Sequence, residues 1–217
     1  MPFKRFSCLF LATFFILFNE TYSQSLGIIY EASSFNFQDF YYNDYSRPSG
    51  LIKNLFFNYN APLSELFNLS LKTGYGWNNY QSSYNDGNNK ETYDEITNGI
   101  PAEAEIQFHH CLGKDSVFEL LIGIGLGYYY YVSKEKASFS TTEHKFTSSG
   151  LAQYMLMGMN INITSCLASS IQFKKIMING ISTKYESENH VEERDYSLGN
   201  GLDDIGVSFG IFINVIK

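Results

Sequence analysis

Large apolar residues alternate with small or polar residues along most of this chain, most clearly near its C-terminus. In residues 204–215, one face of an extended backbone carries Ile205, Val207, Phe209, Ile211, Ile213 and Val215. The other face carries Asp204, Gly206, Ser208, Gly210 and Asn214, and Phe212 is its one large apolar exception. A period of two is the signature of a β-strand, because successive side chains of a strand point to opposite faces.

The same alternation recurs in seven further segments, which are 26–36, 51–60, 67–77, 102–109, 117–132, 150–163 and 166–178. In 117–132, glycine occupies alternate positions as Gly123, Gly125 and Gly127. That spacing suits a helix poorly, but it suits the crowded interior of a small barrel. We therefore expect eight strands and no helix after the N-terminal segment.

Two kinds of connection join these segments, and they alternate along the chain. Short connections lie around 62–65, 112–115 and 164–165, whereas 37–50, 78–98, 133–149 and 179–203 are long and polar. Short turns at one end and long loops at the other are typical of outer-membrane barrels. The pattern predicts an all-β fold, an eight-stranded antiparallel up-and-down transmembrane β-barrel.

Alternation alone does not say which face meets lipid, because a soluble sandwich or a lipocalin-like barrel also alternates. Two features favour lipid on the outside. Small and charged residues share one face in strand after strand, where an eight-stranded barrel has a narrow interior. Aromatic residues also gather near strand ends, as the girdles of membrane barrels do; they are Tyr41, Tyr42, Tyr59, Tyr75, Trp77, Tyr80 and Tyr128 to Tyr131.

Composition excludes three other classes of protein. The chain has 217 residues and a formal net charge of −7, so no basic stripe is available for nucleic acid. An aromatic content of 17% argues against disorder. A mean hydropathy of −0.17 argues against a bundle of transmembrane helices.

The N-terminal segment has the pattern of a signal peptide. Lys4 and Arg5 precede an apolar run over residues 6–18, and Thr21-Tyr22-Ser23 offers small residues at the −3 and −1 positions. We expect a signal peptide over 1–23, cleavage before Gln24 and a barrel domain over 24–217. A single membrane anchor is the alternative. Cys8 lies inside the apolar run, which excludes a lipoprotein; whether Cys111 and Cys166 pair stays open.

Together these features resemble the small eight-stranded outer-membrane β-barrel family of Gram-negative bacteria. A glutamine directly after the cleavage site resembles exported proteins of Bacteroidetes. The resemblance implies residence in the bacterial outer membrane, with the surrounding lipid and the barrel-insertion machinery as partners. One departure is the end of the chain, Phe212-Ile-Asn-Val-Ile-Lys217, because such barrels often end in an aromatic residue.

Charged residues on the inferred inner face are the candidate site. They are Glu31, Lys72, Glu103, Glu105, Glu119, Lys174 and Asp204. A charge in a narrow lumen must be paired or hydrated. These residues therefore form either a charged gate in a small pore or a salt-bridge network that fills a plugged lumen, and the narrow interior favours the network.

Other polar residues give weaker signals. The histidines His109, His110, His144 and His190 have no fixed mutual geometry of the kind that nucleophilic catalysis requires. The carboxylates of 179–203 could hold Ca²⁺, but they lack EF-hand spacing and are expected to be solvated. We expect no cofactor and no metal.

The expected function is therefore non-enzymatic, a structural or surface-interaction role through four long extracellular loops, with a surface ligand or a host or envelope protein as a possible partner. The alternatives are a narrow pore for small solutes, a lipid-modifying outer-membrane enzyme, and a soluble lipocalin-like ligand binder.

Overall fold

The computed structural model describes residues 24–34, 51–85, 90–113, 117–137, 143–187, 190–197 and 203–215. These residues form nine strands: β1 (Gln24–Ser33), β2 (Ile52–Pro62), β3 (Phe67–Asn85), β4 (Lys90–Cys111), β5 (Phe118–Ala137), β6 (Glu143–Asn162), β7 (Leu167–Ser187), β8 (His190–Ser197) and β9 (Asp203–Val215). Within the described residues, no helix is long and apolar enough to cross a membrane. The expected signal peptide, residues 1–23, lies outside the described residues.

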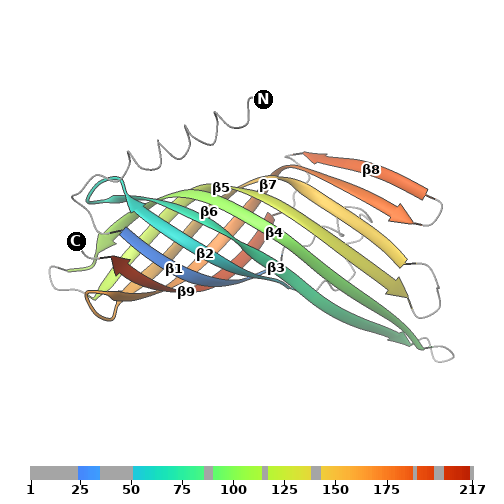
Figure 1. Ribbon diagram of the computed structural model, residues 1–217, viewed down its shortest axis with the longest axis horizontal. Helices are drawn as coiled ribbons and strands as arrows, with labels where there is room; N and C mark the ends of the chain where they lie inside the picture. The colour runs from blue at the N-terminus through green and yellow to red at the C-terminus, as the bar shows by residue number, and fades with distance from the viewer. Residues whose placement is uncertain are drawn as a thin grey trace.

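Each strand pairs antiparallel with its neighbours, and the sheet closes on itself (Figure 1). From β1 to β7 every strand pairs with the next along the chain, while β9 pairs with both β1 and β7. The closed wall therefore consists of β1 to β7 and β9, which confirms the predicted all-β, eight-stranded antiparallel barrel. The short connections lie at 63–66, 112–117 and 163–166, close to where they were predicted.

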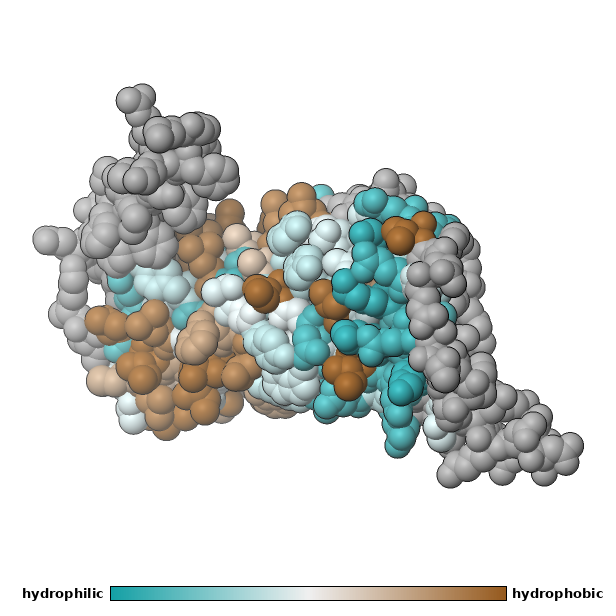
Figure 2. All heavy atoms as spheres, turned by 45° about the vertical axis from the view of Figure 1, so that its right-hand side comes forward, coloured by the Kyte–Doolittle hydropathy of each residue, from teal (hydrophilic) through white to brown (hydrophobic). Residues whose placement is uncertain are grey.

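The barrel has the reverse polarity of a soluble protein. Along β2, Asn54, Phe56 and Asn58 are buried, whereas Leu55 and Phe57 are 41% and 68% exposed. Figure 2 shows apolar residues gathered over the outer wall of the barrel and hydrophilic residues at the opposite end of the molecule. A polar interior behind an apolar wall is what a membrane barrel requires. It contradicts the lipocalin-like alternative, whose apolar side chains would face inward.

For three of the four predicted long loops, the prediction was largely wrong, because most of their residues belong to strands. β3 continues to Asn85 and β4 begins at Lys90, so most of 78–98 is a paired hairpin rather than a loop. Likewise, β5 and β6 extend through most of 133–149. The reason is physical: the inner face of these hairpins is buried but polar, with Thr97, Ser133 and Thr183 almost inaccessible to solvent, so backbone pairing continues without any apolar alternation in the sequence. The fourth loop, 37–50, lies outside the described residues.

The predicted loop 179–203 also contains a strand that the sequence did not predict. The upper part of β7 pairs with β8, which returns alongside it from His190 to Ser197. On the other side of the molecule, β2 pairs with β3 only as far as Trp77. Among the described residues, β3 to β8 therefore form an open sheet above the barrel, here called the upper sheet, with β8 and the upper part of β3 at its two edges (Figure 1).

The expected aromatic girdle needs one correction. Tyr128 and Tyr130 are 48% and 42% exposed on the outer wall, but Tyr129 and Tyr131 are buried in the interior. Four consecutive tyrosines cannot share a face, because strand side chains alternate. On the outer wall, Trp77 contacts Tyr30 and Tyr75 with ring centroids 6.3 Å and 6.1 Å apart. Tyr41 and Tyr42 lie outside the described residues.

Candidate functional site

The inner face of the barrel brings together most of the charged residues singled out from the sequence. Five of them are almost wholly buried: Glu31, Lys72, Glu103, Glu105 and Lys174. The Glu119 side chain is 21% exposed at the short-turn end. Asp204, in β9, pairs with Ile176, but its side chain lies outside the described part of the structure.

Two lysines and three carboxylates form the centre of this cluster. Lys174 Nζ lies 2.5 Å from Glu31 Oε2 and 2.6 Å from Glu103 Oε1. Lys72 Nζ lies 2.8 Å from Glu105 Oε1 and 3.9 Å from Glu103 Oε2. Glu103 therefore links the two lysines. Buried charges persist only when they are paired and hydrogen-bonded, and each lysine here has two carboxylates within reach.

Three buried tyrosines complete the network. The hydroxyl of Tyr129 donates to Glu103 at 2.7 Å, and that of Tyr154 donates to Glu105 at 2.8 Å. The Tyr131 hydroxyl donates to Asn54 Oδ1 at 2.7 Å. Tyr129 and Tyr131 were predicted to belong to the girdle and were not predicted as site residues. Their parity with Gly123, Gly125 and Gly127 in the same strand was the signal that could have placed them inside.

Glycines make room for these rings. A side chain at Gly125 would collide with the Tyr154 ring and would come within 2.8 Å of the Ala104 carbonyl oxygen. A side chain at Gly99 would collide with the Tyr131 ring and with the backbone of Tyr130. The absence of a side chain at Gly125 and Gly99 therefore leaves the space that the tyrosine rings occupy.

The cluster packs the lumen from nearly every side. Seven of the eight barrel strands contribute to it, from β1 with Glu31 to β7 with Lys174. The Lys174 ammonium also lies over the rings of Phe56 and Tyr154, 5.6 Å and 4.9 Å from their centroids. An eight-stranded barrel leaves an interior just wide enough for its side chains. We call this group of charged and aromatic side chains the plug.

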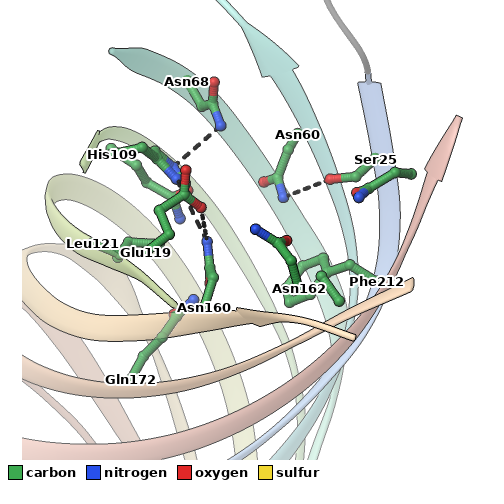
Figure 3. A pocket seen from close by; sticks show the side chains of 13 residues that line it. Ser25, Asn60, Asn68, His109, Glu119, Leu121, Asn160, Asn162, Gln172 and Phe212 are labelled. Atoms are coloured by element: carbon green, nitrogen blue, oxygen red, sulfur yellow. Dashed lines mark hydrogen bonds and ion pairs between the residues drawn. The ribbon is translucent and has the colours of Figure 1, made fainter. Parts of the chain in front are cut away.

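A polar cavity of about 190 Å³, here called the vestibule, lies between the plug and the short-turn end of the barrel (Figure 3). Glu119 Oε2 accepts from Asn160 at 2.9 Å and lies 3.1 Å from His109 Nδ1. The second ring nitrogen of His109, Nε2, lies 3.1 Å from Nδ2 of Asn68 and 3.0 Å from the side-chain oxygen Oε1 of Gln107. His109 was not predicted as a lumen-site residue, although it is in phase with the buried Glu103, Glu105 and Gln107 of its strand.

Ion pairs also join the strands of the upper sheet. Glu186 accepts from Lys145 at 2.8 Å and from Lys184 at 2.5 Å. These two hydrogen bonds lower the pKa of the Glu186 carboxyl to about 2. Glu186 was one of the acidic residues considered for Ca²⁺. In the described residues, no group of three or more histidine, cysteine or acidic side chains could hold a metal ion.

The remaining histidines and the two cysteines lie outside the plug and the vestibule. His144 stacks on Tyr185, with its Nδ1 2.6 Å from the tyrosine hydroxyl. His110 is exposed at the short-turn end, and the His190 side chain lies outside the described part. Cys111 and Cys166 are both exposed, free thiols.

No family model matches the sequence, and no curated protein does either. Solved structures do match. A major outer membrane protein from Thermus thermophilus is similar at a TM-score of 0.53 and 10% identity, over 89% of this chain and 100% of that one. OprG from Pseudomonas aeruginosa is similar at a TM-score of 0.51 and 11% identity, over 90% of this chain and 97% of that one.

Ail, the attachment invasion locus protein of Yersinia pestis, is similar at a TM-score of 0.50 and 10% identity, over 89% of this chain and 97% of that one. At identities this low, the structural similarity establishes the fold alone. The fold and the apolar outer wall together define a small transmembrane β-barrel of the outer-membrane type, and the place of such a barrel is the bacterial outer membrane. The resemblance to Bacteroidetes proteins stays a prediction.

Proposed function

We propose that this protein is a non-enzymatic outer-membrane barrel that holds the upper sheet at the cell surface as an interaction surface. The observation that carries this proposal is the plug. Because paired charges and tyrosine rings pack the lumen, the parts left to act on other molecules are the outer wall and the upper sheet. The short turns then face the periplasm, as they do in bacterial barrels.

The upper sheet has the features of a binding surface. It extends the strands well beyond the apolar belt, and ion pairs such as Lys134–Glu143 at 2.7 Å join neighbouring strands. Its edges at β8 and upper β3 present backbone groups, which can pair with an extended segment of a partner. Ail, whose name describes attachment and invasion, has a similar fold. That likeness supports a surface partner, such as a host or envelope protein, without naming one.

Thiol labelling on intact cells tests the orientation. Cys111 and Cys166 lie at the short-turn end, so a membrane-impermeant maleimide should label them only after the outer membrane is permeabilised. With both replaced by serine, Gln81→Cys in upper β3 should be labelled on intact cells. Labelling of the native cysteines on intact cells would invert the orientation and remove the proposal.

The interaction role needs a separate measurement. Replacing residues 82–93 by a two-residue turn shortens the β3–β4 hairpin and leaves the barrel intact. Cells that express the full-length protein should attach to surfaces or to other cells more strongly than cells with the shortened hairpin. Equal attachment at equal surface expression would leave only a structural role.

A narrow pore is the second candidate, because charged side chains line the lumen and the vestibule leads from the short-turn end up to them. Purified protein in planar bilayers distinguishes the two candidates. The proposed function predicts no conductance steps, whereas steady conductance by the wild-type protein would favour the pore. A lipid-modifying enzyme has weaker support, because His144 is engaged by Tyr185.

The proposal includes the route to the membrane. We infer that residues 1–23 act as a signal peptide that is removed before Gln24, and that the barrel-insertion machinery and the membrane lipid are its partners there. The intact mass of protein purified from the outer membrane tests the cleavage site. A mass that retains residues 1–23 would favour the anchor alternative.

A further inference from the structure

The plug leaves the vestibule unfilled. This cavity of about 190 Å³ is lined by side chains near the short turns (Figure 3). At about 30 Å³ per water molecule, it holds roughly six waters, or one small polar molecule in their place. It lies at the opposite end of the barrel from the upper sheet, so a site here is additional to the proposed surface function.

Open amide groups face this cavity. Asn162 is only half-buried, and its side-chain amide has no hydrogen-bond partner among the described residues. Gln172 is 3% exposed; its Nε2 donates to Ser170 Oγ at 3.5 Å, while its Oε1 has no partner within the described structure. Figure 3 shows Asn160 and Asn162 directed into the same space. Because buried polar groups are normally hydrogen-bonded, the open amides require water or a ligand.

Hydrogen bonds hold the neighbouring part of the lining in place. Glu119 Oε2 accepts from Asn160 and faces His109 Nδ1. The other ring nitrogen of His109 contacts the side chains of Asn68 and Gln107. Side chains fixed in this way lose little rotamer freedom when a ligand binds, so the site is preorganised.

The charges of the lining favour a neutral ligand. Among the described residues that line the vestibule there is no lysine or arginine, so an anion has no free cation to pair with. The single carboxylate of the lining, Glu119, is already engaged by His109 and Asn160. Amides supply both hydrogen-bond donors and acceptors, and hydroxyl groups do the same. The open amides therefore match a molecule rich in hydroxyl groups.

One wall of the vestibule is apolar. Phe212, the large apolar exception on the inner face of β9, lines the cavity together with Leu121 and Ala168. A side chain at Gly27 or Gly210 would collide with the Phe212 ring, so both glycines leave space for the ring inside the lumen. A sugar ring has hydroxyl groups at its edge and apolar C–H groups on its faces. It therefore matches amides on one side and an aromatic ring on the other.

We propose that the vestibule binds one neutral sugar ring, which enters from the short-turn end. The amides of Asn162 and Gln172 hydrogen-bond its hydroxyl groups, and Phe212 packs against a face of the ring. With the proposed orientation of the barrel, the sugar comes from the periplasm. Binding itself does not depend on that orientation or on the role of the upper sheet, so each can fail without the other.

Titrations followed by saturation-transfer NMR test the site on the purified barrel in a phosphocholine detergent, whose headgroup is not a sugar. The probes are glucose, galactose, mannose and N-acetylglucosamine. Asn162→Ala removes an open amide, and Asn79→Ala removes an exposed amide in upper β3. Ala168→Leu fills the cavity, and Ala102→Leu adds the same bulk on the outer wall. We expect saturable binding of at least one probe by the wild-type protein.

For that probe, Asn162→Ala and Ala168→Leu should weaken binding about fivefold or more, as the loss of one or two hydrogen bonds implies. The two controls should change it less than about twofold. No saturable binding of any probe would overturn the site, and equal losses for Asn162→Ala and Asn79→Ala would place the binding outside the vestibule. Glucuronate or glucosamine that binds as tightly as the uncharged sugars would overturn the neutral assignment. All variants must show heat-modifiable migration in gels, so that a loss of binding is not a loss of folding.

Discussion

Lys174 is the side chain on which the plug depends most. It is nearly inaccessible to solvent and bridges two buried carboxylates, Glu31 and Glu103. Replacing Lys174 by methionine keeps most of the volume but leaves both carboxylates without their shared cation. Removing one partner of a buried ion pair costs about 3–5 kcal/mol. We expect Lys174→Met to lower the free energy of unfolding by that amount, measured by urea unfolding and the fluorescence of Trp77, the single tryptophan.

Lys134→Met is the matched control for this measurement. Lys134 also has a carboxylate partner, Glu143 at 2.7 Å, but both side chains are about half exposed in the upper sheet. Exposed ion pairs contribute at most about 1 kcal/mol. A similar small loss for both variants would mean that Lys174 is hydrated in the folded barrel, and the plug would then not be a sealed network.

For a single residue, its place in the alternating pattern of its strand is the sequence feature that best predicts whether it faces the lumen or the lipid. Parity alone assigns Lys72 and Lys174 to the inner face, since each is in phase with the small and polar residues of its own strand. Parity also assigns Tyr129 and Tyr131 to the inner face, but their residue type favours the girdle as well, because tyrosine suits both a membrane interface and a buried hydrogen bond. The partners of each lysine also depend on which strands meet across the lumen, and a single strand sequence does not contain that information.

The hairpins above the apolar belt are the elements whose structure departs most from the sequence prediction. Segments such as 92–99 look like loop sequence, yet they pair with β3 on one side and β5 on the other. We expect their backbone amides to exchange with deuterium far more slowly than those of the turn at 63–66, because exchange requires the ladder to open. Mass spectrometry after peptic digestion measures both regions in one experiment.

Fast exchange throughout 92–99 would contradict the hairpins and restore the predicted loop. The prediction from sequence failed here for a definite reason. Inside the bilayer, lipid on one face and a polar lumen on the other impose alternation on the side chains. Above it that constraint ends, and residues such as Asn98 and Thr97 suit a strand and a loop equally. The short turns were predictable because apolar alternation stops on both sides of each of them.

The whole molecule should behave as a heat-modifiable membrane protein. A closed sheet satisfies every ladder hydrogen bond within the belt, and such a barrel can remain folded in SDS until it is heated. We expect the unboiled protein from the outer-membrane fraction to migrate differently from the boiled protein in gels. A protein that is recovered from the soluble periplasmic fraction and shows no shift would contradict the membrane barrel.

The pairing of β1 with β9 has a consequence for how the barrel assembles. Neighbouring hairpins bring together residues that are close in sequence, whereas this seam joins opposite ends of the described chain, such as Ser25 and Asn214. Closing it carries the largest loop entropy, so topology makes it the slow step. Glu31 is carried on β1, and its partner Lys174 lies on β7, beyond β9. Closure of the β1–β9 seam therefore also brings Glu31 to Lys174. The resulting ion pair spans β9 and stabilises the closed seam.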